Sequence, residues 1–161
     1  MNLNLMRLSI IAAGLLVLGQ VHYLIAHKEG IRTHGQLIFL ALAPVDPRSL
    51  MQGDYMTLNF DLARTLSANM TDAQRQLGGT FRAPLQIDQR GIAVLAKTAN
   101  AEPALRYKLR GQQIWLGTNG YFFEEGSAKK FEAARFGAFR MDRKSGEAVL
   151  VALADENLNL L

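Results

Sequence analysis

The sequence predicts an α+β protein in which one N-terminal transmembrane helix precedes a mainly antiparallel β domain of about eight strands, arranged as a sandwich or open barrel, with two helices. Three observations predict this class: an uncharged apolar stretch near the N-terminus, a series of short apolar runs separated by turn residues, and one longer segment with helical periodicity. The 161 residues are enough for the anchor and one ordinary domain.

The uncharged stretch is residues 8–26, LSIIAAGLLVLGQVHYLIA. As a helix it would cover roughly 28 Å, which is enough to span the hydrocarbon core of a bilayer. The alternative is a cleaved secretory signal, but Leu24 occupies a position where signal cleavage needs a small residue. We therefore expect residues 1–26 to be a retained anchor and residues 27–161 to be the domain.

Basic residues flank both ends of the stretch, with Arg7 before it and Lys28 and Arg32 after it, so the positive-inside rule does not decide its orientation. A C-terminal domain can be translocated largely regardless of its charge, so we expect a single pass with the domain on the extracytoplasmic side. Gln20 and His22 interrupt the apolar stretch and are candidate contacts with a partner helix. In the alternative, His22 lies in the interfacial belt and Gln20 bonds within its own helix.

Strand signals dominate after the anchor. Residues 36–43 and 55–60 each predict a buried or half-buried strand, and residues 121–123 predict a short one. Three pairs of apolar runs flank turns that contain Gly91, Gly111 and Gly146, and therefore predict antiparallel hairpins. The hairpins pair residues 85–88 with 92–97, 105–109 with 113–116, and 139–142 with 148–153.

Two helices are expected within this β pattern. The first begins near Asp61 and ends at Gly78, because apolar residues recur at spacings of 4, 4, 3 and 4. These residues are Leu62, Leu66, Met70, Ala73 and Leu77. The second spans residues 128–135, with Ser127 placed to cap its start and Gly137 placed to end it.

Composition restricts the chemistry. Zero Cys excludes disulfides, thiolate metal sites and cysteine nucleophiles, and the sequence has three His and no HExxH, phosphate-binding glycine loop or Gly-x-Ser-x-Gly motif. We expect no cofactor and no metal. The net charge of +4 is spread along the chain, so we expect no nucleic-acid partner and regard the lipid bilayer as the neighbouring surface.

Residues 46–60, DPRSLMQGDYMTLNF, combine turn chemistry with a strand. Pro47 fixes its own φ, and Gly53 permits a positive φ just before the strand that begins at Tyr55. Asp46 and Asp54 can accept backbone N–H groups in such a turn, so a structural role is the alternative to a binding role.

Here the sequence resembles the GDYxxLxY family of bacterial membrane-anchored proteins, whose function is undefined. The match is Gly53-Asp54-Tyr55 and Leu58, with Phe60 in place of the final Tyr. It extends to residues 46–48, 121–126, 134–140 and 149–152. The resemblance implies a single-pass protein of the bacterial inner membrane with its C-terminal domain in the periplasm, and membrane proteins as partners. It implies no established chemistry.

We hypothesise that residues 46–60 and 121–140 meet in space, because charged groups are rarely buried unless they are paired. In the competing view each charge is solvated separately. For Glu124 and Glu125, a further alternative is that one of them is buried and forms only a structural ion pair with Arg135 or Arg140. Adjacent residues on a strand point to opposite faces, so the carboxylates of Glu124 and Glu125 would not bind the same ligand. The candidate binding residues are Asp46, Arg48, Asp54, Tyr55, Glu124, Glu125, Arg135 and Arg140.

These observations favour a non-enzymatic, membrane-tethered extracytoplasmic interaction module, an accessory subunit of a polytopic membrane protein complex. The alternative is a membrane-anchored hydrolase that uses Ser49 or a carboxylate. A Ser/Lys pair would need a distant lysine, because no Lys occurs between Asp54 and Lys97.

The topology can be tested directly. A reporter that is active only after export, fused after Leu161, should be active, and the fusion should stay in the membrane fraction after a carbonate wash, because the anchor is retained. Activity of a cytoplasmic reporter at the same position would contradict the expected orientation.

Overall fold

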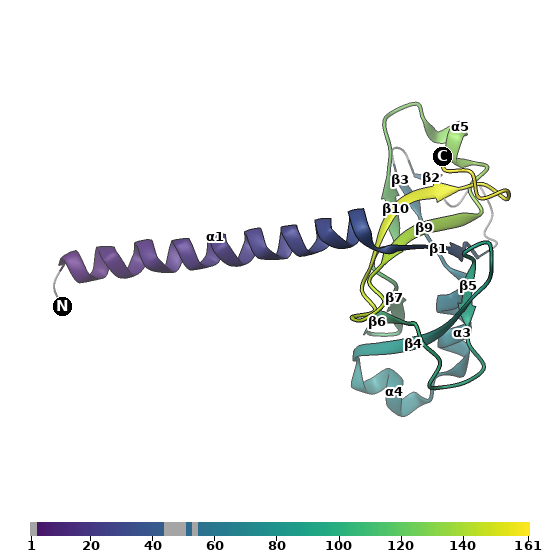
Figure 1. Ribbon diagram of the computed structural model, residues 1–161, viewed down its shortest axis with the longest axis horizontal. Helices are drawn as coiled ribbons and strands as arrows, with labels where there is room; N and C mark the ends of the chain where they lie inside the picture. Colours follow the sequence, from purple (N-terminus) through teal and green to yellow (C-terminus); the bar gives the residue numbers. More distant parts are fainter. Residues whose placement is uncertain (1–2, 44–50, 53–54) are drawn as a thin grey trace.

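The computed structural model describes residues 3–43, 51–52 and 55–161, and confirms the predicted α+β class (Figure 1). Its elements are, in order, α1 (Leu3–His34), β1 (Gln36–Ala41), β2 (Met51–Gln52), β3 (Tyr55–Thr57), α3 (Asp61–Asn69), α4 (Asp72–Leu77), β4 (Gly79–Ile87), β5 (Ala93–Leu95), β6 (Ala104–Arg110), β7 (Gln113–Trp115), β8 (Gly120–Phe122), α5 (Ala128–Phe131), β9 (Phe136–Met141) and β10 (Ala148–Ala154).

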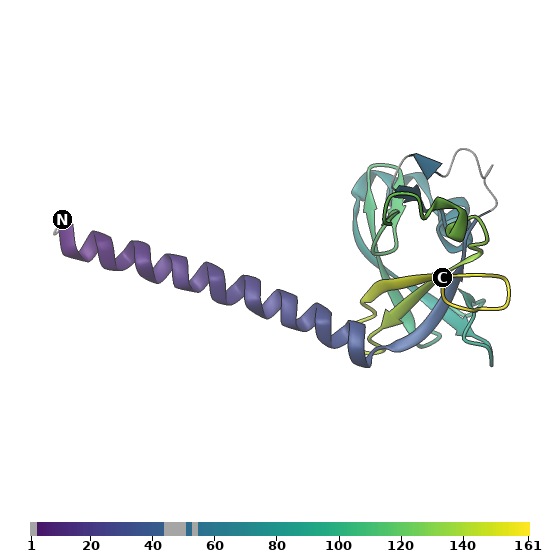
Figure 2. The ribbon, with the colours of Figure 1, turned by 90° about the horizontal axis from the view of Figure 1, so that it is seen from above.

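The strands form three sheets, with the orders β1-β9-β10, β2-β3-β8 and β5-β4-β6-β7, and their neighbouring strands are antiparallel. A parallel bridge between Phe39 and Ile92 links the first sheet to the third. The sheets curl around a common interior as a half-open barrel (Figure 2). The three predicted hairpins are confirmed as β4–β5, β6–β7 and β9–β10.

A main hydrophobic core joins the three sheets, and a second, smaller cluster contains Phe39, Ala138 and Ala154. Alternate residues of the strands point inward, as the pleat requires, and Phe60 and Phe139 meet edge to face with ring centroids 5.4 Å apart. The largest fully buried side chains come from β1, β3, β4, β6, β9, β10 and the residue after β7; they are Ile38, Leu40, Met56, Leu85, Leu105, Leu116, Phe139, Met141 and Leu153.

Helix α1 continues without a break from the apolar stretch to the edge of the domain, and projects away from it (Figure 1). Residues 6–34 are long and apolar enough to cross a membrane, which is consistent with single-pass anchoring. Residues 6–30 are exposed, whereas Ile31 is only 5% exposed. The segment between anchor and strand β1 is therefore helical and packed on the domain.

A sharp turn at Gly35 connects α1 to β1. A Cβ atom on this residue would lie 2.5 Å from the Ile31 carbonyl oxygen and 2.9 Å from the Met141 backbone nitrogen. Real side chains do not make such short contacts, so glycine is needed where the helix end meets strand β9.

The predicted length of the first helix is wrong, because residues 61–77 form two helices, α3 and α4. Thr71 starts a new helix with a capping box, in which its hydroxyl accepts from the Gln74 N–H and the Gln74 side chain accepts from the Thr71 N–H. Leu66 remains buried, but Leu77 is 79% exposed. The apolar periodicity continues through Met70, although α3 ends at Asn69 and the capping box of Thr71 starts a separate helix.

The second predicted helix is also shorter than expected, because α5 ends at Phe131, and Ser127 makes no side-chain capping hydrogen bond. Gly137 does not end this helix but lies inside β9. A Cβ atom at Gly137 would lie 2.8 Å from the ring of Phe60. The glycine therefore allows a close approach between strand and ring.

The turn at Gly146 gives a test of the packing between hairpins. Gly146 and Gly111 both have positive φ, +73° and +58°. A Cβ atom at Gly146 would also overlap the Ala104 carbonyl oxygen, whereas no atom lies within 4 Å of a Cβ atom at Gly111. The left-handed conformation costs an alanine about 1–2 kcal/mol at either position. Gly146→Ala should destabilise the full chain by about 2 kcal/mol more than Gly111→Ala, because of the overlap. Denaturant unfolding in detergent measures this, and equal losses would contradict it.

Candidate functional site

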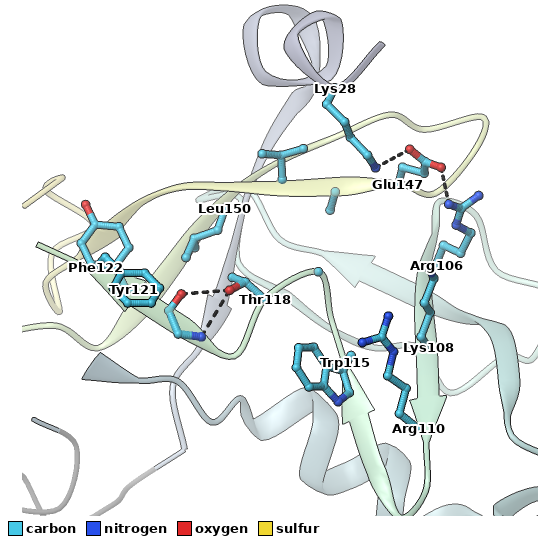
Figure 3. Close-up of a pocket in the computed structure, with 14 residues that line it drawn as sticks. Lys28, Arg106, Lys108, Arg110, Trp115, Thr118, Tyr121, Phe122, Glu147 and Leu150 are labelled. Carbon is cyan, nitrogen blue, oxygen red and sulfur yellow. Dashed lines mark hydrogen bonds and ion pairs between the residues drawn. The ribbon is translucent and has the colours of Figure 1, made fainter. Parts of the chain in front are cut away.

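An open groove of about 490 Å³ lies beside the domain end of α1, between β6 and β7 on one side and β8 and β10 on the other (Figure 3). This volume is within the usual range of small-molecule sites. The two walls of the groove differ in chemistry.

Glu147, just before β10, holds the rim of the groove. Its side chain is 11% exposed and contacts three basic groups, of which Figure 3 shows Lys28 and Arg106. The Lys28 ammonium donates to Oε2 at 2.6 Å, His27 Nε2 lies 3.2 Å from the same oxygen, and the Arg106 guanidinium pairs with Oε1. This network ties α1, β6 and the β9–β10 turn together.

Burial alone would raise the pKa of Glu147. The hydrogen bond from Lys28, the charges of Lys28 and Arg106, and the hydrogen bond with His27 outweigh burial and hold this pKa below its ordinary value. The carboxylate is therefore ionised at neutral pH, and its chemistry is that of a counter-ion and not of a general acid.

The first wall is a row of cations on β6. Arg106, Lys108 and Arg110 alternate along the strand and so share one face. The Arg110 guanidinium lies 5.1 Å from the centroid of the Trp115 ring, a cation–π distance. Among the described residues, no carboxylate lies within ion-pair distance of Lys108 or Arg110. With Lys28, four basic residues and one acidic residue line the groove, a formal surplus of three positive charges.

The second wall is apolar and aromatic. Leu150 points into the groove from β10, and Tyr121 and Phe122 border it from β8 (Figure 3). Phe122 is 80% exposed. Between the walls, the Thr118 hydroxyl donates to the Gly120 carbonyl at 2.9 Å and accepts from its N–H at 3.2 Å, which shapes the connecting turn. The groove is therefore amphiphilic.

Among the predicted site residues, Tyr55 contacts a residue that lines the groove. It pairs with Phe122 across β3 and β8, and their ring centroids are 5.7 Å apart. Residues 55–57 and 121–122, which belong to the two segments expected to meet, thus lie on the adjacent strands β3 and β8. Asp46, Arg48 and Asp54, together with Ser49 of the hydrolase alternative, lie outside the described residues.

The remaining charged candidates do not form one cluster within the part of the chain that the structure describes. Glu124 and Glu125 are both exposed between β8 and α5, and neither has a salt bridge to a described arginine. Arg135 donates to the carbonyl oxygens of Glu132 and Ala134 at 3.1 and 2.8 Å.

Arg140 has a structural contact at the base of the anchor. Its guanidinium donates to the Gly35 carbonyl oxygen at 3.0 Å and so supports the turn between α1 and β1. Gln20 and His22 are both exposed on α1. Because a helix turns about 100° per residue, they are about 200° apart and point to nearly opposite faces.

Sequence reasoning missed the residues that build the groove: Lys28, Arg106, Lys108, Arg110, Trp115 and Glu147. The alternation of basic residues with Leu105, Tyr107 and Leu109 was a usable signal for the β6 row. No local pattern indicated Glu147, because its partner Lys28 is 119 residues away in the sequence. Within the described ranges, no three His, Cys, Asp or Glu residues form a group that would hold a metal ion.

A protein-family model described as GDYXXLXY protein matches residues 17–153. The chain belongs to the GDYXXLXY family. No curated protein and no solved structure matches the chain. The family match confirms the resemblance and includes both Lys28 and Glu147.

The structure divides the described part of the GDYXXLXY motif between groove and core. Tyr55 packs against Phe122 of the groove wall, whereas Leu58 and Phe60 are each 3% exposed in the core. Phe60, in place of the final Tyr of the motif, packs against Phe139. An apolar ring suits this position, because a buried hydroxyl would need a hydrogen-bond partner.

The ionised state of Glu147 gives a pH prediction. Since its folded pKa lies below the ordinary value of 4.5, its contribution to stability is present above about pH 4.5 and is lost as the pH falls through the lower folded pKa. Glu147→Gln should lower the free energy of unfolding at pH 7 by about 1–3 kcal/mol. The variant should also lose less stability than the unmodified chain when the pH is lowered.

The matched control is Glu102→Gln, which removes an exposed ion pair with Arg82 at 3.7 Å. Such exposed pairs contribute at most about 1 kcal/mol. Unfolding of the full chain in detergent at pH 7 and pH 3 measures both effects. An unchanged pH dependence in Glu147→Gln would show that the network does not stabilise the fold.

Proposed function

We propose that this GDYXXLXY-family chain is a membrane-tethered interaction module, an accessory subunit that docks on a polytopic membrane protein. The proposal places α1 across the bacterial inner membrane and the β domain in the periplasm. The observation that carries it is that the polar residue Gln20 and the domain lie on the same side of one continuous helix.

The helix geometry gives this alignment. Gln20 precedes the buried Ile31 by about three turns, so the two side chains lie within about 20° of each other around the helix axis. Ser9 and Ala13 share this face. Small and polar residues favour close helix packing in membranes, because there is no hydrophobic drive between helices there. A partner helix on this face would lie beside the domain as well.

The rigid junction supports a docking role. The helix is unbroken through the interface, Glu147 binds its side chains, and Arg140 binds the turn that follows it. Contacts made by α1 within the membrane therefore set the orientation of the domain. A flexible tether would not transmit such an orientation.

The opposite faces of Gln20 and His22 allow a matched test. A photo-crosslinking amino acid at position 20, in the full chain in its native membrane, should form an adduct with a multi-span membrane protein identified by mass spectrometry. The same group at position 22 should form this adduct at least tenfold less often, because it points away from the domain side.

Equal yields at the two positions would contradict the proposed docking face. Adducts only with lipid, or only with a second copy of the chain, would contradict a polytopic partner.

A further inference from the structure

We propose that the groove binds the phosphate headgroup of an anionic phospholipid from the bilayer that α1 crosses. This inference rests on the membrane anchoring in the proposed function and does not require the protein partner. Three observations carry it: the position of the groove at the level of the lipid headgroups, its charge, and its two unlike walls.

The groove opens at the depth of the lipid headgroups. Lys28 lines it and lies two residues beyond the uncharged stretch 8–26, or about 3 Å along the helix. The headgroup layer is about 5–7 Å thick on each side of the hydrocarbon core. In Figure 1, β6, β7 and the β9–β10 turn lie at the side of the domain from which α1 leaves. A lipid beside α1 would thus meet the groove without leaving the bilayer.

The charge of the groove suits a phosphate. Lys28 and Arg106 share Glu147, whereas Lys108 and Arg110 have no carboxylate partner among the described residues. Both are exposed, so binding does not require a buried ion pair to break. Guanidinium groups bind phosphate oxygens with two parallel hydrogen bonds, and lysine adds a point charge.

The second wall favours an amphiphile. Opposite the cations are Leu150, Tyr121 and the exposed ring of Phe122, which would contact the glycerol and the first methylene groups. Trp and Tyr are the residues that favour the membrane interface. A soluble phosphate would leave this wall unused, and an acidic peptide would not need the position at headgroup depth. The observations therefore favour a phospholipid over both.

The single tryptophan of the chain, Trp115, lies in the groove and reports on it directly. The full chain, purified in a non-ionic detergent, is titrated with short-chain phosphatidylglycerol while the Trp115 emission is followed. A saturable change is expected. Short-chain phosphatidylcholine and soluble glycerol 3-phosphate should each need at least tenfold higher concentration for the same change.

Lys108→Gln combined with Arg110→Gln should raise the phosphatidylglycerol midpoint at least tenfold. Arg143→Gln combined with Lys144→Gln is the matched control, since these exposed residues lie in the β9–β10 turn outside the groove; its midpoint should change less than twofold. Because Arg110 contacts the indole, midpoints and not amplitudes are compared. Native mass spectrometry of bound lipid gives a second measurement.

Four results would overturn the proposal. These are equal midpoints for the two lipids, equal effects of the two double variants, glycerol 3-phosphate binding as well as phosphatidylglycerol, or a soluble acidic peptide changing the Trp115 emission at a lower concentration than the lipid. The purified chain contains no partner, so a failed crosslink at position 20 leaves this result intact.

Discussion

One carboxylate, Glu147, pairs with three basic groups and fixes how the helix α1 meets the β domain. Glu147 connects Lys28 of α1 to Arg106 of β6. Within the described residues, this is the side-chain connection between α1 and the sheet that contains β6. Removing the Glu147 carboxylate would leave Lys28 and Arg106 without this shared counter-ion. The direction of the anchor and the rim of the groove therefore depend on the same contact.

Glycines make this arrangement sterically possible. Gly35 brings the end of α1 against the β9 backbone, and Gly146 brings the β9–β10 turn against β6, where the Arg106 N–H donates to the Gly146 carbonyl at 2.7 Å. Both positions lack space for a Cβ atom. The side-chain network and the backbone contacts therefore support one junction, and the family match covers all of it.

Patterns that depend on neighbouring residues were readable from the sequence, and contacts between distant segments were not. The hairpin around Gly146 followed from turn chemistry, and α1 followed from apolar length. The break between α3 and α4 needed the capping box at Thr71, which competes with a continuing apolar stripe. The groove itself needed the meeting of Lys28 with Glu147, which only the packed fold produces. Of the predicted site residues, Tyr55 reaches Phe122 of the groove wall because β3 pairs with β8.

The rigid helix and the groove act on the domain in different ways. A helix that spans a bilayer fixes the distance of its domain from the membrane but leaves rotation about the helix axis free. The groove lies beside α1, so in a bilayer the attraction of its cations to anionic headgroups would pull that side of the domain toward the membrane. Gln20 faces the side on which Ile31 enters the domain. The proposed partner helix, packed there, would stop the rotation, and the proposed headgroup in the groove would then limit the tilt. Together the two proposed contacts would define one orientation of the domain, which neither defines alone.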